Sequence, residues 1–495
     1  MLASLDRFGP ELAVMVTAGL VLLADLVTPR RHRPWLAALS LAGLAAGAAW
    51  LGVLVLRGRE APFFNDSMSL DNFSIFFVFL FLAVSGAVIV ASLDYAPRFG
   101  SHQGEFLALI LLATSGMMLL AGARDLVAIF VALELTSISQ FILAGLLRDD
   151  KGSEAALKYL LLGAVASAVI LYGMAFLFGL AGTTRLVSSD GAPSIASTIA
   201  AGDAGMRSAL IFSMVFLAAG FGFKMSVVPF QMWTPDVYEG APTPVAAFLS
   251  VGSKAAAFAV VLRIFYEGFG PRTFVGNDWK ELFAILAAIT MCAGNVMALR
   301  QTNIRRMLGY SSIAQAGNFL VGLAAISAFS GGRVSLGASG VVFFLATYAF
   351  TNLGAFIAVL AISNRTGSDE IKDYAGMGRR APVPAAVLLF CLLSLTGLPP
   401  TAGFIAKLYI FNAAVQAHLV WLVIVAVLNT AVAAFYYLGV ARQMYLGTAD
   451  GEPLLRRAPL ATEGLLVIAA AGVLAFGIYP MPLIEAAQRA VNVFG

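Results

Sequence analysis

Residues 208–233 read SALIFSMVFLAAGFGFKMSVVPFQMW, and this stretch decides the fold. It is long enough to cross a bilayer, because a spanning helix needs about 20 mainly apolar residues. A charge at mid-bilayer costs roughly 2.5–3.5 kcal/mol on insertion scales, so Lys224 is expected to face a partner or water. Pro229 breaks or kinks a helix, and broken helices in membranes line buried or water-filled cavities. The stretch therefore predicts a membrane helix that borders a polar interior.

The whole chain has the composition of a polytopic membrane protein. It contains 495 residues, of which 60% are hydrophobic and 12% charged, and its mean hydropathy is +0.89. A soluble domain of this length carries far more charge. We predict an all-α membrane protein of about 14 spans in one integral domain, near residues 10–28, 35–56, 73–93, 104–122, 126–147, 155–181, 208–231, 243–266, 280–299, 304–326, 338–362, 384–413, 417–446 and 461–480.

A second break follows near the other end of the chain. Residues 394–411 read SLTGLPPTAGFIAKLYIF, with Pro399 and Pro400 ahead of Lys407. Two interrupted spans in comparable positions are typical of transporters built from inverted repeats. Lys224 precedes its proline whereas Lys407 follows its pair, so the pattern suggests repeat symmetry without establishing it.

Glu134 is an isolated acid in the stretch VAIFVALELTSISQFILAG. One interpretation is a buried carboxylate that holds helices together, protonated or paired with a lysine. The other is a station on an ion path, which is the usual role of an isolated acid inside a membrane. We favour the path, because four lysines occupy similar surroundings elsewhere in the chain.

The other two lysines outside the predicted breaks are Lys254 and Lys158, and the case for a place on the path is weaker for Lys158. Lys254 lies in FLSVGSKAAAFAVVL, among small residues that allow close approach of neighbouring helices. Lys158 follows Glu154 by four residues, so an ordinary ion pair at a helix end is the alternative to a place on the path. For Lys224 the alternative is a side chain that extends to the membrane interface.

Basic residues predict the orientation of the chain. They concentrate in the connections at 30–33, 300–306 and 365–380. Positively charged loops face the cytoplasm, so we expect both termini on the opposite, periplasmic side of a bacterial inner membrane. The net charge of +4 follows from these loop arginines and indicates no nucleic-acid partner.

No redox centre is expected in this chain. Its two cysteines, Cys292 and Cys391, lie in different predicted spans, which excludes an iron–sulfur cluster held by this chain alone. The sequence contains neither a dinucleotide-binding glycine motif after a strand nor a phosphate-binding loop. The energy for ion movement must then come from a gradient or from partner subunits.

Four blocks resemble the antiporter-like subunits of proton-pumping NADH–quinone oxidoreductase, respiratory complex I. They are the segment Gly222–Phe258, the ALELTSIS block around Glu134, the segment Arg300–Gly317 and the segment from Gly397 onward. The blocks occur in family order and, with the span count, cover essentially the whole chain. FKMS and PDVYEGAP favour the subunit N branch, although other branches and cation/proton antiporter subunits share the broken-helix lysines.

The resemblance implies a fold with two inverted five-helix repeats, each with one broken helix. The first three helices would occupy about 10–93, the first repeat about 104–266, the second about 280–446 and a last helix about 461–480. It also implies partners, namely the neighbouring antiporter-like and small membrane subunits of complex I. NADH, flavin, iron–sulfur clusters and quinone would belong to partner subunits.

The resemblance further implies a proton path along a central polar axis. Glu134 would be the partner of Lys224, with Lys407 as the terminal station and helix breaks at Pro229, Pro399 and Pro400. The full set of path residues is Glu134, Lys158, Lys224, Lys254 and Lys407.

The chain departs from the family at two positions. Gln231 and Gln315 stand where relatives commonly carry histidine, and glutamine cannot titrate. A proton passing there would have to move through water.

Two other functions remain open on the sequence. A secondary cation/proton antiporter would use the same lysines without redox partners. A scaffold with structural charges would gain nothing from two broken helices. The sequence therefore favours a proton-translocating subunit of NADH–quinone oxidoreductase.

Overall fold

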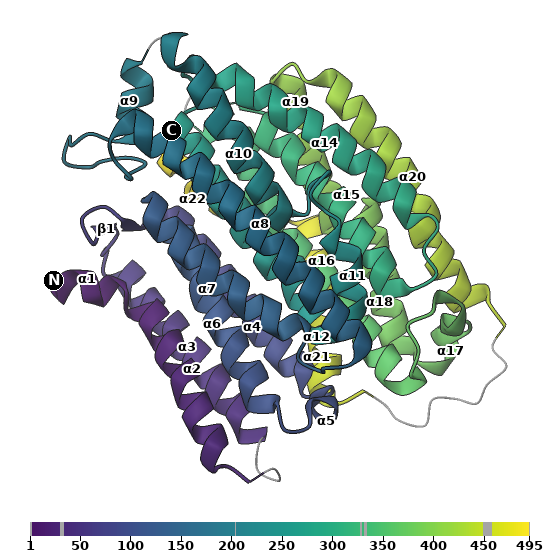
Figure 1. Cartoon of the computed structure of the whole chain (residues 1–495). Coiled ribbons are helices and arrows are strands. Elements are labelled where there is room, and N and C mark those ends of the chain that lie inside the picture. The colour runs from purple at the N-terminus through teal and green to yellow at the C-terminus, as the bar shows by residue number, and fades with distance from the viewer. Residues whose placement is uncertain are drawn as a thin grey trace.

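The computed structural model describes residues 2–29, 34–202, 204–326, 329–330, 334–448 and 458–494. The basic connection at 30–33 lies outside these ranges. Long helices pack side by side along most of the chain (Figure 1). Within the described ranges, twelve are long and apolar enough to cross a membrane. They are α2 (Gly9–Val27), α3 (Pro34–Leu56), α4 (Asn72–Ser92), α6 (Gln103–Gly122), α7 (Leu126–Ala144), α8 (Asp150–Ala181), α10 (Arg207–Met225), the run Thr243–Phe269, α14 (Gly276–Ala298), α16 (Leu336–Thr366), α20 (Val420–Leu446) and α21 (Leu460–Ile478).

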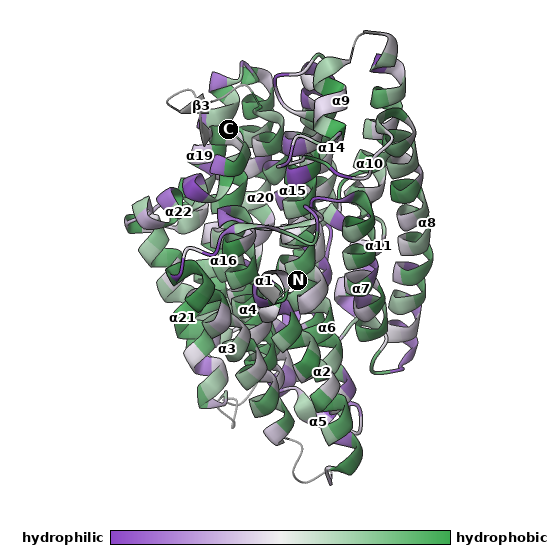
Figure 2. Ribbon diagram, turned by 90° about the vertical axis from the view of Figure 1, so that its left-hand side faces the viewer, coloured by the Kyte–Doolittle hydropathy of each residue, from purple (hydrophilic) through white to green (hydrophobic). Residues whose placement is uncertain are grey.

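Two further elements complete the bundle. α15 (Ile304–Ala324) is long enough to span but carries many polar residues, and α18 (Pro382–Thr396) and α19 (Ala402–Gln416) are the two halves of one interrupted span. With these elements the structure agrees with the predicted number of about 14. Hydrophobic residues follow the lengths of the helices, while hydrophilic residues gather in the connections and at some places inside the bundle (Figure 2).

Both predicted helix breaks are confirmed. α10 ends at Met225 and α11 (Trp233–Gly240) begins beyond the segment that contains Pro229. α18 ends at Thr396, and Pro399 and Pro400 lie in the short segment before α19. Each first half ends in a left-handed residue, Ser226 with φ 62° and Gly397 with φ 87°. Such a residue commonly terminates a helix and leaves its last carbonyl groups for other donors.

The run Thr243–Phe269 is the buried centre of the bundle. It comprises α12 (Thr243–Phe248), a π-helical segment (Leu249–Ser253), α13 (Lys254–Leu262) and a second π-helical segment (Arg263–Phe269). Its whole length is buried, and α16 is almost as deeply buried. Isolated π-helical turns occur frequently at functional sites. The sequence predicted this span but not its two π-helical segments.

The remaining elements lie in connections and at the ends of the chain. Two short antiparallel hairpins pair β1 (Ala61–Phe63) with β2 (Met68–Leu70) and β3 (Phe329–Ser330) with β4 (Val334–Ser335), in the registers Ala61↔Leu70 and Phe329↔Ser335. The short helices are α1 (Leu2–Arg7), α5 (Ala96–Phe99), α9 (Ile195–Ala201), α17 (Met377–Arg380) and α22 (Met481–Val491). None of these was expected from the sequence, because the prediction addressed spanning elements only.

Candidate functional site

Lys224 lies in the last turn of α10, just before the first break. Its side chain is 4% exposed, and Nζ has no hydrogen-bond partner among the described residues. Three aromatic rings surround the amine, with centroids at 4.9 Å for Phe141, 5.5 Å for Tyr159 and 5.6 Å for Phe223. A cation over aromatic faces gains on the order of 0.5–2 kcal/mol, less than a full ion pair at membrane depth would give. This amine is therefore held loosely in its place.

The aromatic surroundings of Lys224 are fixed by the break itself. Trp233, the first residue of α11, donates from Nε1 to the carbonyl of Phe223 at 2.9 Å. Its ring stacks on Tyr159 with centroids 4.3 Å apart. The second half-helix thus satisfies a carbonyl that the break leaves free, and it also holds one wall around Lys224.

Glu134 lies on α7, half-buried, and accepts a hydrogen bond from Ser167 of α8. The Ser167 Oγ to Glu134 Oε1 distance is 2.5 Å. Lys224 forms no ion pair with Glu134 in this conformation. Contact between the two requires a change of side-chain position. The structure thus shows the predicted partners without a direct contact.

Gln140 connects the surroundings of Lys224 to those of Lys254. Its Oε1 accepts from Tyr159 Oη at 3.1 Å and from Ser253 Oγ at 3.0 Å. Tyr159 is one of the rings around Lys224, and Ser253 directly precedes Lys254 at the end of the π-helical segment. One buried amide therefore joins α7, α8 and the central run.

Lys254 is 1% exposed and donates to α15. Its Nζ lies 2.6 Å from Ser312 Oγ and 2.5 Å from the Ser312 carbonyl oxygen. Tyr348 of α16 donates to the same Ser312 Oγ at 3.2 Å, and Tyr238 of α11 lies 3.4 Å from it. Ser312 is the meeting point of the central run, α15, α16 and the half-helix α11.

Lys407 lies in α19, beyond the second break, and is 5% exposed. Its Nζ donates to the carbonyl oxygens of Leu395 at 3.1 Å and Thr396 at 2.9 Å, and it lies 3.4 Å from Thr430 Oγ1. Those carbonyls belong to the last turn of α18, where the helix dipole places partial negative charge. The break therefore supplies the binding site of the lysine amine.

Gln315 of α15 contacts the second break. Its Nε2 donates to the Leu395 carbonyl at 3.0 Å, the same oxygen that Lys407 contacts, and Asn318 donates to its Oε1 at 3.1 Å. Gln315 thus shares an acceptor with Lys407. Gln231 lies in the first break, and its Oε1 is buried with no hydrogen-bond partner in the described part of the chain.

Lys158 lies apart from the buried lysines. Its side chain is 43% exposed and pairs with Glu154 at 2.6 Å and Asp236 at 2.7 Å. Arg306 joins the same acid at 2.7 Å, so α8, α11 and α15 meet in one charged cluster. The ion pair expected as the alternative for Lys158 is present. The second partner, Asp236, was not singled out from the sequence.

Several contact residues could be found only in the structure. Ser167, Tyr159 and Asp236 are ordinary residues of helical segments, and their role depends on which helix faces them. Ser312, Gln315 and Tyr348 stand out as polar residues in apolar spans, but the sequence could not rank them. Among the described residues, no group of three or more His, Cys, Asp or Glu side chains is placed to hold a metal ion.

Two broken helices and three buried lysines, Lys224, Lys254 and Lys407, are the features of an antiporter-like helical membrane protein. The profile of the family described as "NADH:quinone oxidoreductase/Mrp antiporter, TM" matches residues 123–433. The chain is 43% identical over 99% of its length to NADH-quinone oxidoreductase subunit N of Dehalococcoides mccartyi, covering 99% of that protein. It is equally identical to subunit N of Trichlorobacter lovleyi, covering 99% of this chain and 97% of that one.

Solved structures show the same likeness. A chain of respiratory complex I from Thermus thermophilus with bound aureothin superposes with a TM-score of 0.80 at 32% identity, covering 97% of this chain and 99% of that chain. A chain of the Mrp complex from Dietzia sp. DQ12-45-1b reaches 0.83 at 20% identity, covering 99% and 97%, which shows a common fold. The protein described here belongs to the NADH-quinone oxidoreductase subunit N family.

Proposed function

We propose that this chain is an antiporter-like membrane subunit of a bacterial NADH-quinone oxidoreductase and that it moves protons across the membrane. The observation that carries the proposal is the series of three buried lysines, Lys224, Lys254 and Lys407, each close to a broken helix or to the buried central run. Lysine releases a proton far more readily than arginine, so three buried lysines suit a relay better than a permanent ion pair. Membership of the subunit N family, with relatives 43% identical over nearly the whole chain, supports the same function.

The mechanism begins with Glu134 and Lys224. With Glu134 held by Ser167, the Lys224 amine has aromatic contacts but no hydrogen-bond acceptor. If the carboxylate leaves Ser167 and approaches the lysine, it stabilises the protonated amine; if it returns, the amine gives its proton up. A charge or conformational change in a neighbouring subunit would move Glu134 between the two positions.

The released proton then passes toward Lys254 and Lys407. Tyr159 and Gln140 lie between Lys224 and Ser253, and Ser312 bonds the Lys254 amine. Gln315 cannot titrate, so transfer past it uses water that the glutamine orients. Lys407 is the terminal station, from which the proton leaves to the far side. Lys158, in its charged cluster with Glu154 and Asp236, would supply protons to this series.

Partner subunits would carry out the redox chemistry. NADH, flavin, iron–sulfur clusters and quinone would bind in those subunits and not in this chain. The other membrane subunits of complex I are its partners within the bilayer. We place the chain in the bacterial inner membrane with both termini in the periplasm, and we assign its two inverted repeats to about 104–266 and about 280–446. The cation/proton antiporter alternative is less well supported, because the relatives at 43% identity carry the subunit N name.

Lys224→Ala tests the proposal in the assembled complex. Proton pumping and quinone-coupled turnover should fall at least tenfold, while electron transfer from NADH to an artificial acceptor stays intact. Lys372→Ala is the control, because it removes a lysine from an exposed turn outside the bundle. A Lys224→Ala complex that pumps at the wild-type ratio of protons to electrons would remove Lys224 from the path.

A further inference from the structure

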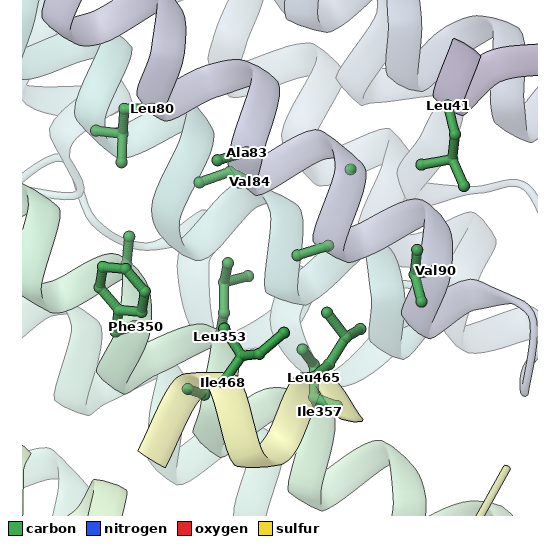
Figure 3. A pocket seen from close by; sticks show the side chains of 14 residues that line it. Leu41, Leu80, Ala83, Val84, Val90, Phe350, Leu353, Ile357, Leu465 and Ile468 are labelled. Carbon is green, nitrogen blue, oxygen red and sulfur yellow. The ribbon is translucent and has the colours of Figure 1, made fainter. Parts of the chain in front are cut away.

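An apolar slot opens between α3, α4, α16 and α21, and none of the buried lysines lines it. Its volume is about 320 Å³, or about 840 Å³ when its open side is counted. Only hydrophobic residues and one glycine line it, and Figure 3 shows their side chains on facing helices. The principal ones are Leu80, Val84, Leu353, Ile357, Leu465 and Ile468. An apolar cavity of this kind holds no ordered water.

The slot continues into a second cavity of about 580 Å³ that has a polar end. Leu80 and Phe350 line both cavities, so the two form one groove. Along α4 the groove extends from Asn72 to Val90, about 27 Å at 1.5 Å per residue. That length is close to the roughly 30 Å thickness of the hydrocarbon core.

The polar end is formed by α22, which follows Pro480 at the end of α21. This helix is amphipathic: it packs Ala487 and Ala490 against the bundle and exposes Glu485 and Arg489. The two charged side chains lie 3.6 Å apart and both line the second cavity. Helices of this type lie in the membrane interface, at the level of the lipid headgroups. In Figure 2, α22 extends sideways from the bundle.

We propose that this groove binds one zwitterionic phospholipid with an ammonium headgroup. An acyl chain occupies the slot, the phosphate contacts Arg489, and the ammonium contacts Glu485. The opposite charges at the polar end match a headgroup that carries both signs. The absence of polar side chains along the slot matches a hydrocarbon chain.

The size of the slot favours a lipid acyl chain over a helix of a partner protein. From Leu80 to Val90 the slot is about 15 Å long, and a helix of 10 Å diameter fills about 1,200 Å³ over that length. The slot with its open side holds about 840 Å³. A helix would therefore lie partly outside the slot, whereas a single hydrocarbon chain fits within it. The bound lipid would join the N-terminal helices to α21.

A crosslinking experiment on the intact respiratory complex tests this proposal. A small diazirine amino acid replaces Ile468 in the slot or, as a matched control, Ile424 on α20. The two side chains are 59% and 56% exposed, but only Ile468 lines the groove. The complex is washed in detergent to remove loosely bound lipid and irradiated, and the labelled peptides are identified by mass spectrometry.

The Ile468 peptide should carry a phospholipid, with phosphatidylethanolamine enriched at least fivefold over its share of the membrane lipids. The Ile424 peptide should carry detergent. Glu485→Ala with Arg489→Ala should abolish the enrichment without loss of complex, since both side chains are exposed. A crosslink from Ile468 to another polypeptide would overturn the proposal in favour of a protein partner. Equal lipid at both positions, or enrichment of an anionic phospholipid, would also overturn it.

Discussion

Replacing Lys407 with arginine separates two roles of this side chain, because arginine keeps the charge and the donors but holds its proton. The lysine amine satisfies the Thr396 carbonyl, for which it is the only donor found in the described structure, and the Leu395 carbonyl, which Gln315 also contacts. An arginine donates to the same oxygens, so the break in α18–α19 should remain intact. Proton release from position 407 should be impaired.

The magnitude follows from the ordinary pKa values of the two side chains. These are about 10.4 for lysine and about 12.5 for arginine, so at one site and one pH the guanidinium is neutral about 100-fold less often. If release from position 407 limits transport, pumping by Lys407→Arg should fall by up to about 100-fold. Lys407→Met should lose pumping too, and it should also lose about 1–3 kcal/mol of stability, since the Thr396 carbonyl is left without a donor.

The assay compares three rates in membrane vesicles: proton uptake by fluorescence quenching, quinone-coupled NADH oxidation, and NADH oxidation with an artificial acceptor. Lys280→Arg is the matched control, because Lys280 also donates to a carbonyl that follows a helix, that of Ala417 at 3.0 Å, but lies outside the lysine series. The control should pump normally. A Lys407→Arg complex that assembles and pumps like the control would refute the assignment of Lys407 as a proton-releasing station.

Three further outcomes are expected. Glu134→Gln combined with Lys224→Met should cost less pumping than the sum of the single losses, since neither charge is then left without its partner; strictly additive losses would argue against coupling. Lys158→Ala should lower pumping but change the unfolding temperature by at most about a degree or two. The reason is that half-exposed ion pairs contribute about 0–1 kcal/mol to stability and that Asp236 keeps its ion pair with Arg306. Unchanged pumping would show that Lys158 has a structural role only. The isolated chain should show neither NADH oxidation nor quinone reduction, and stoichiometric flavin, haem or iron bound to it would contradict this.

From the sequence we could predict those features that depend only on the composition of a single segment. The spans, the two breaks and the buried positions of Lys224, Lys254 and Lys407 follow from long apolar runs interrupted by proline and charge, and the structure agrees with each. The sequence could not predict which helices face one another. Tyr159 stands beside Lys158 in sequence, yet it faces Lys224 because α8 packs against α10 and α11. Likewise Asp236 pairs with Lys158 across 78 residues, a contact that local spacing cannot reveal.

The two helix breaks provide different contacts for their lysines, and in the proposed mechanism this difference would give the series a direction. At the first break Trp233 donates to the carbonyl of Phe223, and the Lys224 amine has no hydrogen-bond acceptor among the described residues. At the second break no tryptophan intervenes, and the carbonyls of Leu395 and Thr396 bind the Lys407 amine directly. A protonated amine is therefore better stabilised at Lys407 than at Lys224 in the conformation with Glu134 held by Ser167. In the proposed mechanism, movement of Glu134 toward Lys224 would reverse the order. A single displacement of this carboxylate would then load the series at one end and, on its return, drive the proton toward the other.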